Sequence, residues 1–264
     1  MATTNKPILA KGIDISSPGQ GKISNWATVS KNVDFVIIRC GYGKNYTNQD
    51  DAQWENNVKA CEKYNIPYGV YLYSYATSTD AAKSEAEHAL RLIKGHKPQY
   101  PVFLDLEESS IAKLGKAKIL EIAKTFCYYI EKAGYTFGIY ANTNWFNNYL
   151  TDSWYNSKIK WLAQYYKEVT YKGSYDIWQY SDSGKVSGID RVVDMNFCYL
   201  SFVPGDINND GKVTASDARK ILRIASGLES ASGQAKKNAD VNGDGKITAA
   251  DAREALRIAS GLSK

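Results

Sequence analysis

A near-copy of one segment near the end of the chain constrains its fold more than any other feature of the sequence. The segment DINNDGKVTASDARKILRIASGL (206–228) returns 34 residues later as DVNGDGKITAADAREALRIASGL (240–262). A repeat of this kind indicates two similar structural units that pack on each other. We therefore predict two domains, one covering residues 1–203 and a smaller one covering residues 204–264.

Each copy contains a loop with the ligand spacing of a calcium-binding EF-hand. That template places oxygen ligands at loop positions 1, 3, 5, 7, 9 and 12, with a glycine at position 6. Gly211 and Gly245 stand at the sixth position. The candidate ligands, with each lysine supplying its backbone carbonyl, are Asp206, Asn208, Asp210, Lys212, Thr214, Asp217, Asp240, Asn242, Asp244, Lys246, Thr248 and Asp251. We expect two structural Ca²⁺ ions, because so small a module buries little core and gains folding energy from bound metal.

The first domain alternates short apolar strands with helical segments. We predict strands, each bounded by turn-forming residues, at 8–16, 35–41, 67–76, 101–107, 136–142, 159–165, 176–181 and 192–199. Helices are predicted at 50–64, 78–95 and 110–133, and the later connections are too short for crossover helices. The pattern predicts an α/β fold, an irregular (β/α)5β3 TIM-like barrel, followed by a small all-α module.

Acidic residues occur on three of the predicted strands. Asp105 and Glu107 are two residues apart on the fourth strand, so their side chains face the same way. Two facing carboxylates do not both ionise cheaply, and a raised pKa on one of them suits a general acid. Asp14 on the first strand and Asp194 on the eighth are expected to join them, because these strands are neighbours in a closed barrel. Each acid could instead be a helix cap or a surface charge, and for Asp14 taken alone that explanation would be preferred.

The composition of the chain argues against some classes of partner and favours others. The formal net charge is +5, and the basic residues are scattered, which argues against nucleic acid. No apolar run is long enough to span a membrane. Twenty Tyr and six Trp against seven Phe favour stacking on sugar rings, although any one of them is as readily a core residue. The four cysteines are expected to be buried thiols rather than disulfides or metal ligands: Cys40, Cys61, Cys127 and Cys198.

Residues 8–200 resemble the glycoside hydrolase family 25 lysozymes (N-acetylmuramidases). The resemblance is carried by GIDISSPGQGKISNW, FVIIRCGYG, PYGVYLYSYA, PVFLDLEE, GIYAN, WLAQY, DIWQYSDSGKVSGI and VVDMNF, which occur in the family's order. It implies hydrolysis of the β-1,4 bond between N-acetylmuramic acid and N-acetylglucosamine in bacterial peptidoglycan, without a catalytic cofactor. One departure is the loop SSPGQG, which is longer than in many relatives and leaves Asp14 in place.

The resemblance also implies roles for individual residues. Glu107 corresponds to the general acid, Asp105 to the residue that orients or activates the substrate's 2-acetamido group, and Asp14 and Asp194 to flanking acids. A sugar groove is implied at Tyr73, Tyr75, Tyr140, Trp161, Gln164, Tyr165, Trp178 and Gln179, with Tyr140 and Trp178 foremost. Retaining, inverting and substrate-assisted mechanisms all remain open, and we favour the last.

Two calcium loops, each followed by a single helix, resemble a type I dockerin. A dockerin implies binding to a cohesin domain of a scaffoldin in a cellulosome-like complex, through Ala215, Ser216, Arg223, Ala249, Ala250 and Arg257. The similar copies allow two binding orientations, and apart from cohesin we expect a monomer. A scaffold-bound enzyme implies an extracellular location. MATTNKP lacks the apolar core of a signal peptide, so either the protein is cytosolic or an export signal has been removed, and the dockerin-like module favours the second.

Three other interpretations remain. A chitinase-like hydrolase of another β-1,4-glycan has similar acid pairs, and a non-catalytic sugar-binding scaffold keeps the groove without the chemistry. A calcium-regulated signalling protein is disfavoured because each loop lacks an entering helix and has Asp, not Glu, at its last position.

Overall fold

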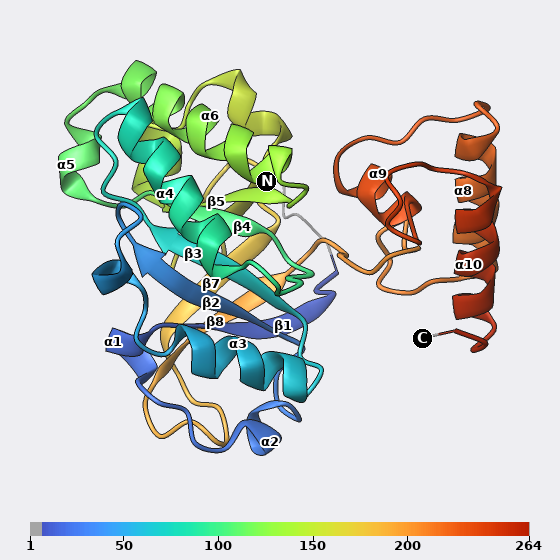
Figure 1. Ribbon diagram of the computed structural model, residues 1–264, viewed down its shortest axis with the longest axis horizontal. Helices are drawn as coiled ribbons and strands as arrows, with labels where there is room; N and C mark the ends of the chain where they lie inside the picture. Colours follow the sequence, from blue (N-terminus) through green and yellow to red (C-terminus); the bar gives the residue numbers. More distant parts are fainter. Residues whose placement is uncertain (1–6, 264) are drawn as a thin grey trace. The chain divides into compact units, whose positions relative to one another are not determined.

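The computed structural model describes residues 7–263 of the chain. The chain divides into two compact units (Figure 1). One unit is Ala10–Cys198, and the other joins Tyr199 and the residues after it to those before Ala10. The two units are described separately below.

The larger unit is a closed barrel of eight strands in chain order, as the sequence predicts. The strands are β1 (Ala10–Ile15), β2 (Phe35–Tyr42), β3 (Tyr68–Tyr73), β4 (Val102–Asp105), β5 (Phe137–Asn142), β6 (Ile159–Ala163), β7 (Ile177–Gly184) and β8 (Val193–Cys198). Neighbouring strands from β1 to β7 are parallel. Strand β8 is antiparallel to both β7 and β1. The start of β8 therefore lies at the end of the barrel where the other seven strands finish.

The helices lie between the strands, mostly in the first two thirds of the barrel. They are α1 (Ser17–Gln20), α2 (Trp26–Val29), η1 (Thr47–Gln49), α3 (Trp54–Lys63), α4 (Thr79–Leu92), α5 (Ser109–Ala112), α6 (Lys116–Lys132), α7 (Thr143–Asn148) and η2 (Ser153–Ser157). The Ser78 side chain caps α4 by accepting a hydrogen bond from the Ala81 amide. Helices α4 and α6 pack against each other over the strands (Figure 1).

One predicted helix is divided in the structure. The sequence predicts a single helix over 110–133, but α5 ends at Ala112 and α6 begins at Lys116. Gly115, with φ of 80°, separates them. This left-handed conformation is accessible to glycine and ends the regular helical path. About one turn of helix is thereby set apart from α6, shortly after the end of β4.

Large aromatic rings fill the lower part of the barrel. Residues that pair across strands share a face, and Phe35 and Phe103 point inward beside Gly12 and Gly138. A Cβ atom on either glycine would collide with the neighbouring ring, so the rings occupy the space that the glycines leave. The polar residues are consequently confined to the other end. The four cysteines are buried thiols, as predicted.

The smaller unit consists of three helices and two loops. The helices are α8 (Ala215–Ala225), α9 (Gly233–Ala239) and α10 (Ala249–Ala259), and α8 packs on α10. Helix α9 was not predicted from the sequence. The buried core is small: Ile207, Ala218, Ile221, Ala239, Ala252 and Ala255. Among the residues that the structure describes, no helix is long and apolar enough to cross a membrane.

Candidate active site

The four predicted acids lie on, or just after, three strands, and all are at the same end of the barrel. Asp14 and Asp194 lie directly opposite each other in the β1–β8 ladder. Asp105 is the last residue of β4, and Glu107 follows two residues later. The charges of Asp14 and Glu107 both act on Asp105, and the charge of Asp194 acts on Glu107. The structure therefore brings these four side chains together.

Asp14 is buried and held by two amide side chains. Its Oδ2 accepts hydrogen bonds of 2.8 Å from both Gln179 Nε2 and Asn196 Nδ2. Its carboxyl group is also hydrogen-bonded to that of Asp194. Burial, and then the Asp194 charge, hold the pKa of Asp14 well above its ordinary value. Burial also raises the pKa of Asp194, and the two hydrogen-bonded carboxyl groups titrate as a pair.

Asp105 is buried without a complete set of partners. Its side chain is 3% exposed, and its Oδ1 atom has no hydrogen-bond partner. Burial raises the pKa of Asp105 well above its ordinary value, and the charges of Glu107 and Asp14 raise it further, while Arg39 lowers it. A buried oxygen without a partner is costly, and such atoms call for a functional explanation. Here the orphaned oxygen lies beside the predicted general acid.

Glu107 lies at the rim, where its side chain is exposed. Partial desolvation, followed by the charges of Asp194 and Glu108, raises its pKa above the ordinary value. It lines a cleft of about 630 Å³ that also includes Tyr140, Gln164 and Tyr165. A carboxyl group with a raised pKa at the edge of a cleft is suited to donate a proton to a bound ligand.

Three of the predicted groove residues form one hydrogen-bonded set. The hydroxyl groups of Tyr140 and Tyr165 each donate to Gln179 Oε1 at 2.8 Å. The same amide donates through Nε2 to Asp14. Gln164 supports the cleft wall by binding the Thr170 side chain and backbone. The cleft wall is thus connected by hydrogen bonds to the buried acid pair.

Tyr73 and Tyr75 lie at the end of β3, next to the acids of β4. Their ring centroids are 5.1 Å apart, and the Tyr75 ring meets Tyr42 edge-on at 6.3 Å. The Tyr73 hydroxyl donates to Glu108 Oε2 at 3.3 Å. Tyr75 is 49% exposed, so its ring is accessible to a ligand.

The structure does not bring the two predicted tryptophans to the cleft. Trp161 points into the barrel, where it is 1% exposed and donates to Asn196 Oδ1 at 2.7 Å. Trp178 lies on the opposite face of β7 from Gln179, because side chains alternate along a strand. Its ring packs on Phe197, and its indole N–H donates to the Gln164 carbonyl at 2.8 Å. Both rings support the site's framework rather than the cleft surface.

Several residues around the site were not singled out from the sequence. Arg39 on β2 points into the barrel, and the alternation of side chains along the strand, which puts it on the same face as Phe35, was the signal that could have placed it. The cleft wall also includes Asn142, Thr143, Asn144, Ala163, Tyr166 and Thr170. The hydroxyl of Thr143 is buried without a hydrogen-bond partner, so this wall contains an unsatisfied polar group.

The two loops of the smaller unit have matching backbone geometry. In the first, Asp206 Oδ2 accepts from the Gly211 amide at 2.8 Å, and Asp210 Oδ1 accepts from Lys212. In the second, Asp240 and Asp244 make the equivalent bonds. The two loop glycines have positive φ values of 84° and 83°, as a tight turn requires.

The last acid of each loop caps the helix that follows. Asp217 accepts from the Thr214 amide and hydroxyl, and Asp251 does so from Thr248. Hydrogen bonds to these carboxylates explain why the pKa of Asp251 is lowered despite burial. Among the described residues, no three His, Cys, Asp or Glu side chains converge as a ready metal cluster.

The predicted partner residues lie on the surface of α8 and α10. Ala215, Ser216, Ala249 and Ala250 are exposed in the first turns. The two arginines differ in their partners. Arg223 Nε pairs with Glu229, beyond the end of α8, whereas Arg257 Nε contacts Glu254 on its own helix and Ser263.

Comparison with known proteins identifies both units. The family model for glycosyl hydrolases family 25 matches residues 13–189, which is most of the chain. The chain belongs to glycosyl hydrolase family 25. A second model, the dockerin type I domain, matches residues 204–254, so this family 25 protein carries a C-terminal dockerin.

The relatives of this family 25 chain include cell-wall lytic proteins. It is 30% identical over 193 residues to an autolytic lysozyme of Clostridium acetobutylicum, covering 70% of the chain and 55% of that protein. The autolysin LytC of Streptococcus pneumoniae, solved with a synthetic peptidoglycan ligand, superposes with a TM-score of 0.64 at 28% identity, covering 71% of this chain and 46% of LytC. The catalytic domain of the endolysin ply40, from bacteriophage P40 of Listeria monocytogenes, gives 0.62 at 27% identity, covering 71% and 92%. The chain thus spans about half the length of the first two relatives.

Proposed function

We propose that this chain is a 1,4-β-N-acetylmuramidase that cleaves the bond between N-acetylmuramic acid and N-acetylglucosamine in peptidoglycan. The observation that carries the proposal is the unpartnered Oδ1 of Asp105, buried beside Glu107. Both sugars of peptidoglycan bear a 2-acetamido group, whose N–H is the donor that this oxygen lacks. The similarity to an autolytic lysozyme and to a peptidoglycan-bound autolysin supports the same substrate.

The proposed chemistry divides the work between two carboxyl groups. Glu107, whose raised pKa favours the protonated form, donates its proton to the glycosidic oxygen as the bond to C1 breaks. Asp105 accepts the acetamido N–H, so that the acetamido oxygen bonds to C1 and forms an oxazolinium ion. Water then attacks C1, loses a proton to Glu107 and restores the acetamido group. The charged member of the Asp14–Asp194 pair stabilises the positive charge that develops on the sugar.

The direct test is the mass of the products. Purified peptidoglycan treated with the protein should give fragments that end in reducing N-acetylmuramic acid. Reducing N-acetylglucosamine ends would identify a different bond and overturn the proposal. Cleavage of chitin oligosaccharides but not of cell walls would favour the chitinase-like alternative, and cleavage of neither would favour a sugar-binding scaffold.

Replacing Asp194 with Asn should move the alkaline limb of the activity profile to lower pH. The Asp194 charge is the second-largest cause of the raised pKa of Glu107, so its removal lowers that pKa. The proton donor is then lost at a lower pH, because a general acid is active only below its own pKa. Profiles of kcat/KM against pH for the two proteins measure the shift. An unmoved alkaline limb would show that Asp194 does not set the ionisation of Glu107.

We also propose that the two loops of the dockerin are EF-hand-like and hold two structural calcium ions. The residues fit such an ion because Asp206 and Asp217 are almost fully buried, with only N–H and hydroxyl groups as their hydrogen-bond partners. Buried carboxylates of this kind need a cation to offset their desolvation. Calcium prefers oxygen ligands, and when bound it supplies positive charge beside the loop carboxylates.

The remaining assignments follow from this two-part organisation. We propose an irregular (β/α)5β3 barrel in residues 1–203, joined to a dockerin in residues 204–264 that binds a cohesin domain. The exposed residues at the starts of α8 and α10 and the two arginines form the proposed contact surface, in either of two orientations. The protein would then act outside the cell on a cellulosome-like scaffold, as a monomer apart from its cohesin.

A further inference from the structure

Helix α4 presents two buried polar side chains to the loops at the mouth of the barrel. Glu85 and His88 lie three residues apart on this helix, and both are fully buried. Residues at this spacing share one face of a helix. Lys83 and Glu87, on the same helix, are exposed and pair with each other. Nothing in the chemistry proposed above assigns a task to the buried pair.

Glu85 holds the segment that follows β3. Its Oε2 accepts a hydrogen bond from the Ser74 hydroxyl at 2.7 Å, and its Oε1 accepts one from the Tyr75 amide at 2.8 Å. The same hydroxyl accepts a hydrogen bond from the Ala76 amide at 3.2 Å. Ser74 is fully buried, so loss of the carboxyl group would leave its hydroxyl without an acceptor, which is costly. The backbone at Tyr75 is therefore fixed by a side chain of α4.

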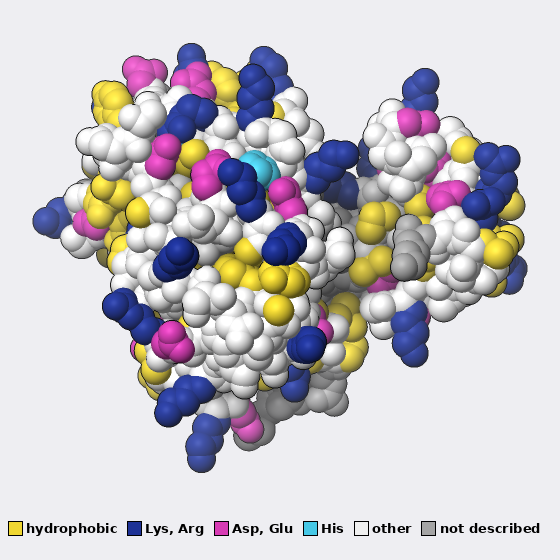
Figure 2. Space-filling model, turned by 60° about the horizontal axis from the view of Figure 1, so that its bottom comes forward, with side chains coloured by type: hydrophobic (Ala, Val, Ile, Leu, Met, Phe, Trp, Pro, Cys, Tyr) yellow, Lys and Arg dark blue, Asp and Glu magenta, His cyan; other side chains and the backbone are white. Residues whose placement is uncertain are grey.

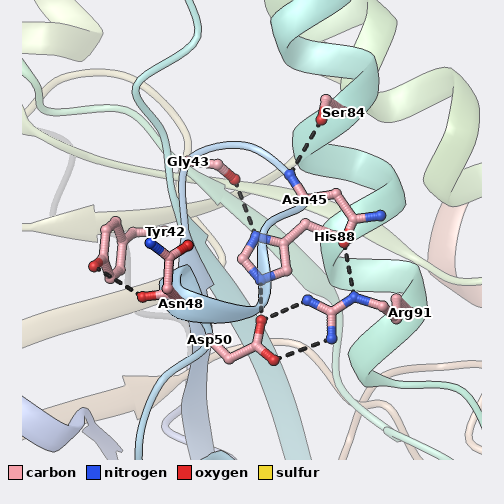
Figure 3. A network of polar contacts seen from close by, with 8 residues as sticks. All are labelled: Tyr42, Gly43, Asn45, Asn48, Asp50, Ser84, His88 and Arg91. Atoms are coloured by element: carbon pink, nitrogen blue, oxygen red, sulfur yellow. Dashed lines mark hydrogen bonds and ion pairs between the residues drawn. The ribbon is translucent and has the colours of Figure 1, made fainter.

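The same helix is joined to the loop that follows β2 (Figure 3). His88 Nε2 lies 2.8 Å from Asp50 Oδ1, and His88 Nδ1 lies 3.0 Å from the Gly43 carbonyl oxygen. The Arg91 guanidinium group donates two hydrogen bonds to Asp50 and a third, of 2.7 Å, to Asn45 Oδ1. Helix α4 is therefore held to the barrel by contacts that do not involve Glu85.

The segment that Glu85 holds lies beside the acids of β4. Tyr73 is paired with Asp105 in the β3–β4 register, and the Ser74 amide donates to the Asp105 carbonyl oxygen at 3.1 Å. Tyr75 follows and is 49% exposed. The cleft described above is formed by residues at and beyond the ends of β4, β5 and β6, and β3 is the other neighbour of β4. The end of β4 therefore lies between the cleft and Tyr75.

We propose that Glu85 is a positioning residue for substrate binding, which fixes the Tyr75 segment so that the Tyr75 ring stacks on a sugar across β4 from the cleft. A tyrosine ring offers a flat apolar face that suits a sugar ring. A segment that is fixed before the ligand arrives loses less conformational entropy on binding. This inference rests on the proposed function and adds to it the support of one sugar-binding ring.

The test removes the acceptor and follows both Tyr75 and the substrate. Glu85→Met keeps a side chain of similar length but accepts no hydrogen bond from the Tyr75 amide. KM on purified peptidoglycan should rise by about two- to tenfold, the range for one hydrogen bond, while kcat changes less. Exchange of the Tyr75 amide hydrogen with solvent, followed by NMR in the full-length protein, should become faster, because the segment opens more often.

Matched variants identify the acceptor as the group that matters. Burial raises the pKa of Glu85 to about 7, but both forms of a carboxyl group offer an acceptor to the Tyr75 amide. Glu85→Gln also keeps an acceptor and should leave KM and Tyr75 exchange near their wild-type values. Glu87→Met removes an exposed carboxylate from the same helix and should change neither quantity. Glu85→Leu repeats the loss of the acceptor if the methionine variant does not fold.

A double-mutant cycle separates this role from a general loss of stability. If Glu85 acts through Tyr75, then Glu85→Met should raise KM little further in a protein that already carries Tyr75→Ala. A merely structural role would raise KM by the same factor in both proteins. Thermal unfolding of each variant shows whether the barrel is folded at the temperature of the assay.

The inference and the proposed function fail in different ways. A Tyr75 amide that exchanges at the same rate in wild type and Glu85→Met would overturn the inference, and so would a KM effect that is equal with and without the Tyr75 ring. A wild-type protein that cuts no peptidoglycan, but whose Tyr75 amide exchanges faster in Glu85→Met, would overturn the proposed function and support the hold of Glu85 on the Tyr75 segment.

Discussion

Replacing Glu107 with Gln should lower kcat on peptidoglycan by about 10²–10⁴-fold, the usual contribution of a general acid. Glutamine has nearly the same shape but no proton to give to the leaving oxygen. Because Glu107 is exposed at the rim, the change should leave folding intact. Binding of the glycan should also survive, so that KM changes far less than kcat. Release of reducing ends from purified cell walls measures the loss.

The neighbouring residue provides a matched control. Glu108 is also a carboxylate, but it caps α5 by accepting a hydrogen bond from the Ser110 amide at 3.2 Å. These bonds lower the pKa of Glu108, so at neutral pH it has no proton to donate. Glu108→Gln should therefore keep most of the activity. If instead the Glu107 variant stays active and the Glu108 variant does not, the general acid has been assigned to the wrong carboxylate.

Removing calcium should unfold the dockerin while leaving the barrel folded. The core of the dockerin contains only two buried isoleucines and four alanines, which is too little apolar surface to offset chain entropy. An ion present at a thousandfold its Kd contributes about 4 kcal/mol to folding. Calorimetry should show a low-temperature transition that disappears with a chelator, and a second transition that does not move. Loss of helical circular dichroism should accompany the change.

Variants within the loops distinguish calcium binding from a general salt effect. The double change Asp206→Asn and Asp240→Asn removes one ligand charge from each loop, so it should lower the calcium affinity of both. Glu229→Gln removes a carboxylate of the same unit that pairs with Arg223 outside the loops, and it should leave the affinity unchanged. A dockerin whose transition stays in place after chelation would rule out a structural role for calcium.

The sequence predicted the number of strands and the meeting of the acids, because both depend on local patterns. Short apolar runs bounded by turn-forming residues marked all eight strands, and the two-residue spacing placed Asp105 and Glu107 at one end of β4. The direction of β8 relative to its neighbours was not predictable in the same way, because an apolar run is equally compatible with parallel and antiparallel pairing. Only pairing with β1 and β7 shows that Asp194, near the start of its strand, reaches the barrel mouth.

The predictions for Trp161 and Trp178 illustrate a different limit. A strand motif shows that a ring is present, but the face that it occupies depends on register with its neighbours. Gln179 points inward to Asp14, so Trp178 must point outward. Arg39 escaped notice for a related reason, because its partner Asp51 lies on the following loop and the ion pair exists only in three dimensions. Long-range pairing of this kind leaves no periodic trace in a sequence.

The basic side chains that Figure 2 shows are spread over the surface it presents, in keeping with the scattered lysines and arginines of the sequence. The charged groups that act on the active site are instead the carboxyl groups at the mouth of the barrel.

The shared acceptor on Gln179 has a consequence for how a glycan enters. One amide oxygen accepts hydrogen bonds from the hydroxyl groups of both Tyr140 and Tyr165, and Tyr165 is 46% exposed. An incoming sugar hydroxyl can take the place of the Tyr165 hydroxyl on that oxygen, with one donor exchanged for another. Such an exchange conserves the number of hydrogen bonds and contributes little net affinity. Affinity for the polymer must then come from aromatic rings that stack against sugar rings. The exchanged hydrogen bond instead helps to fix the position of the glycan in the cleft.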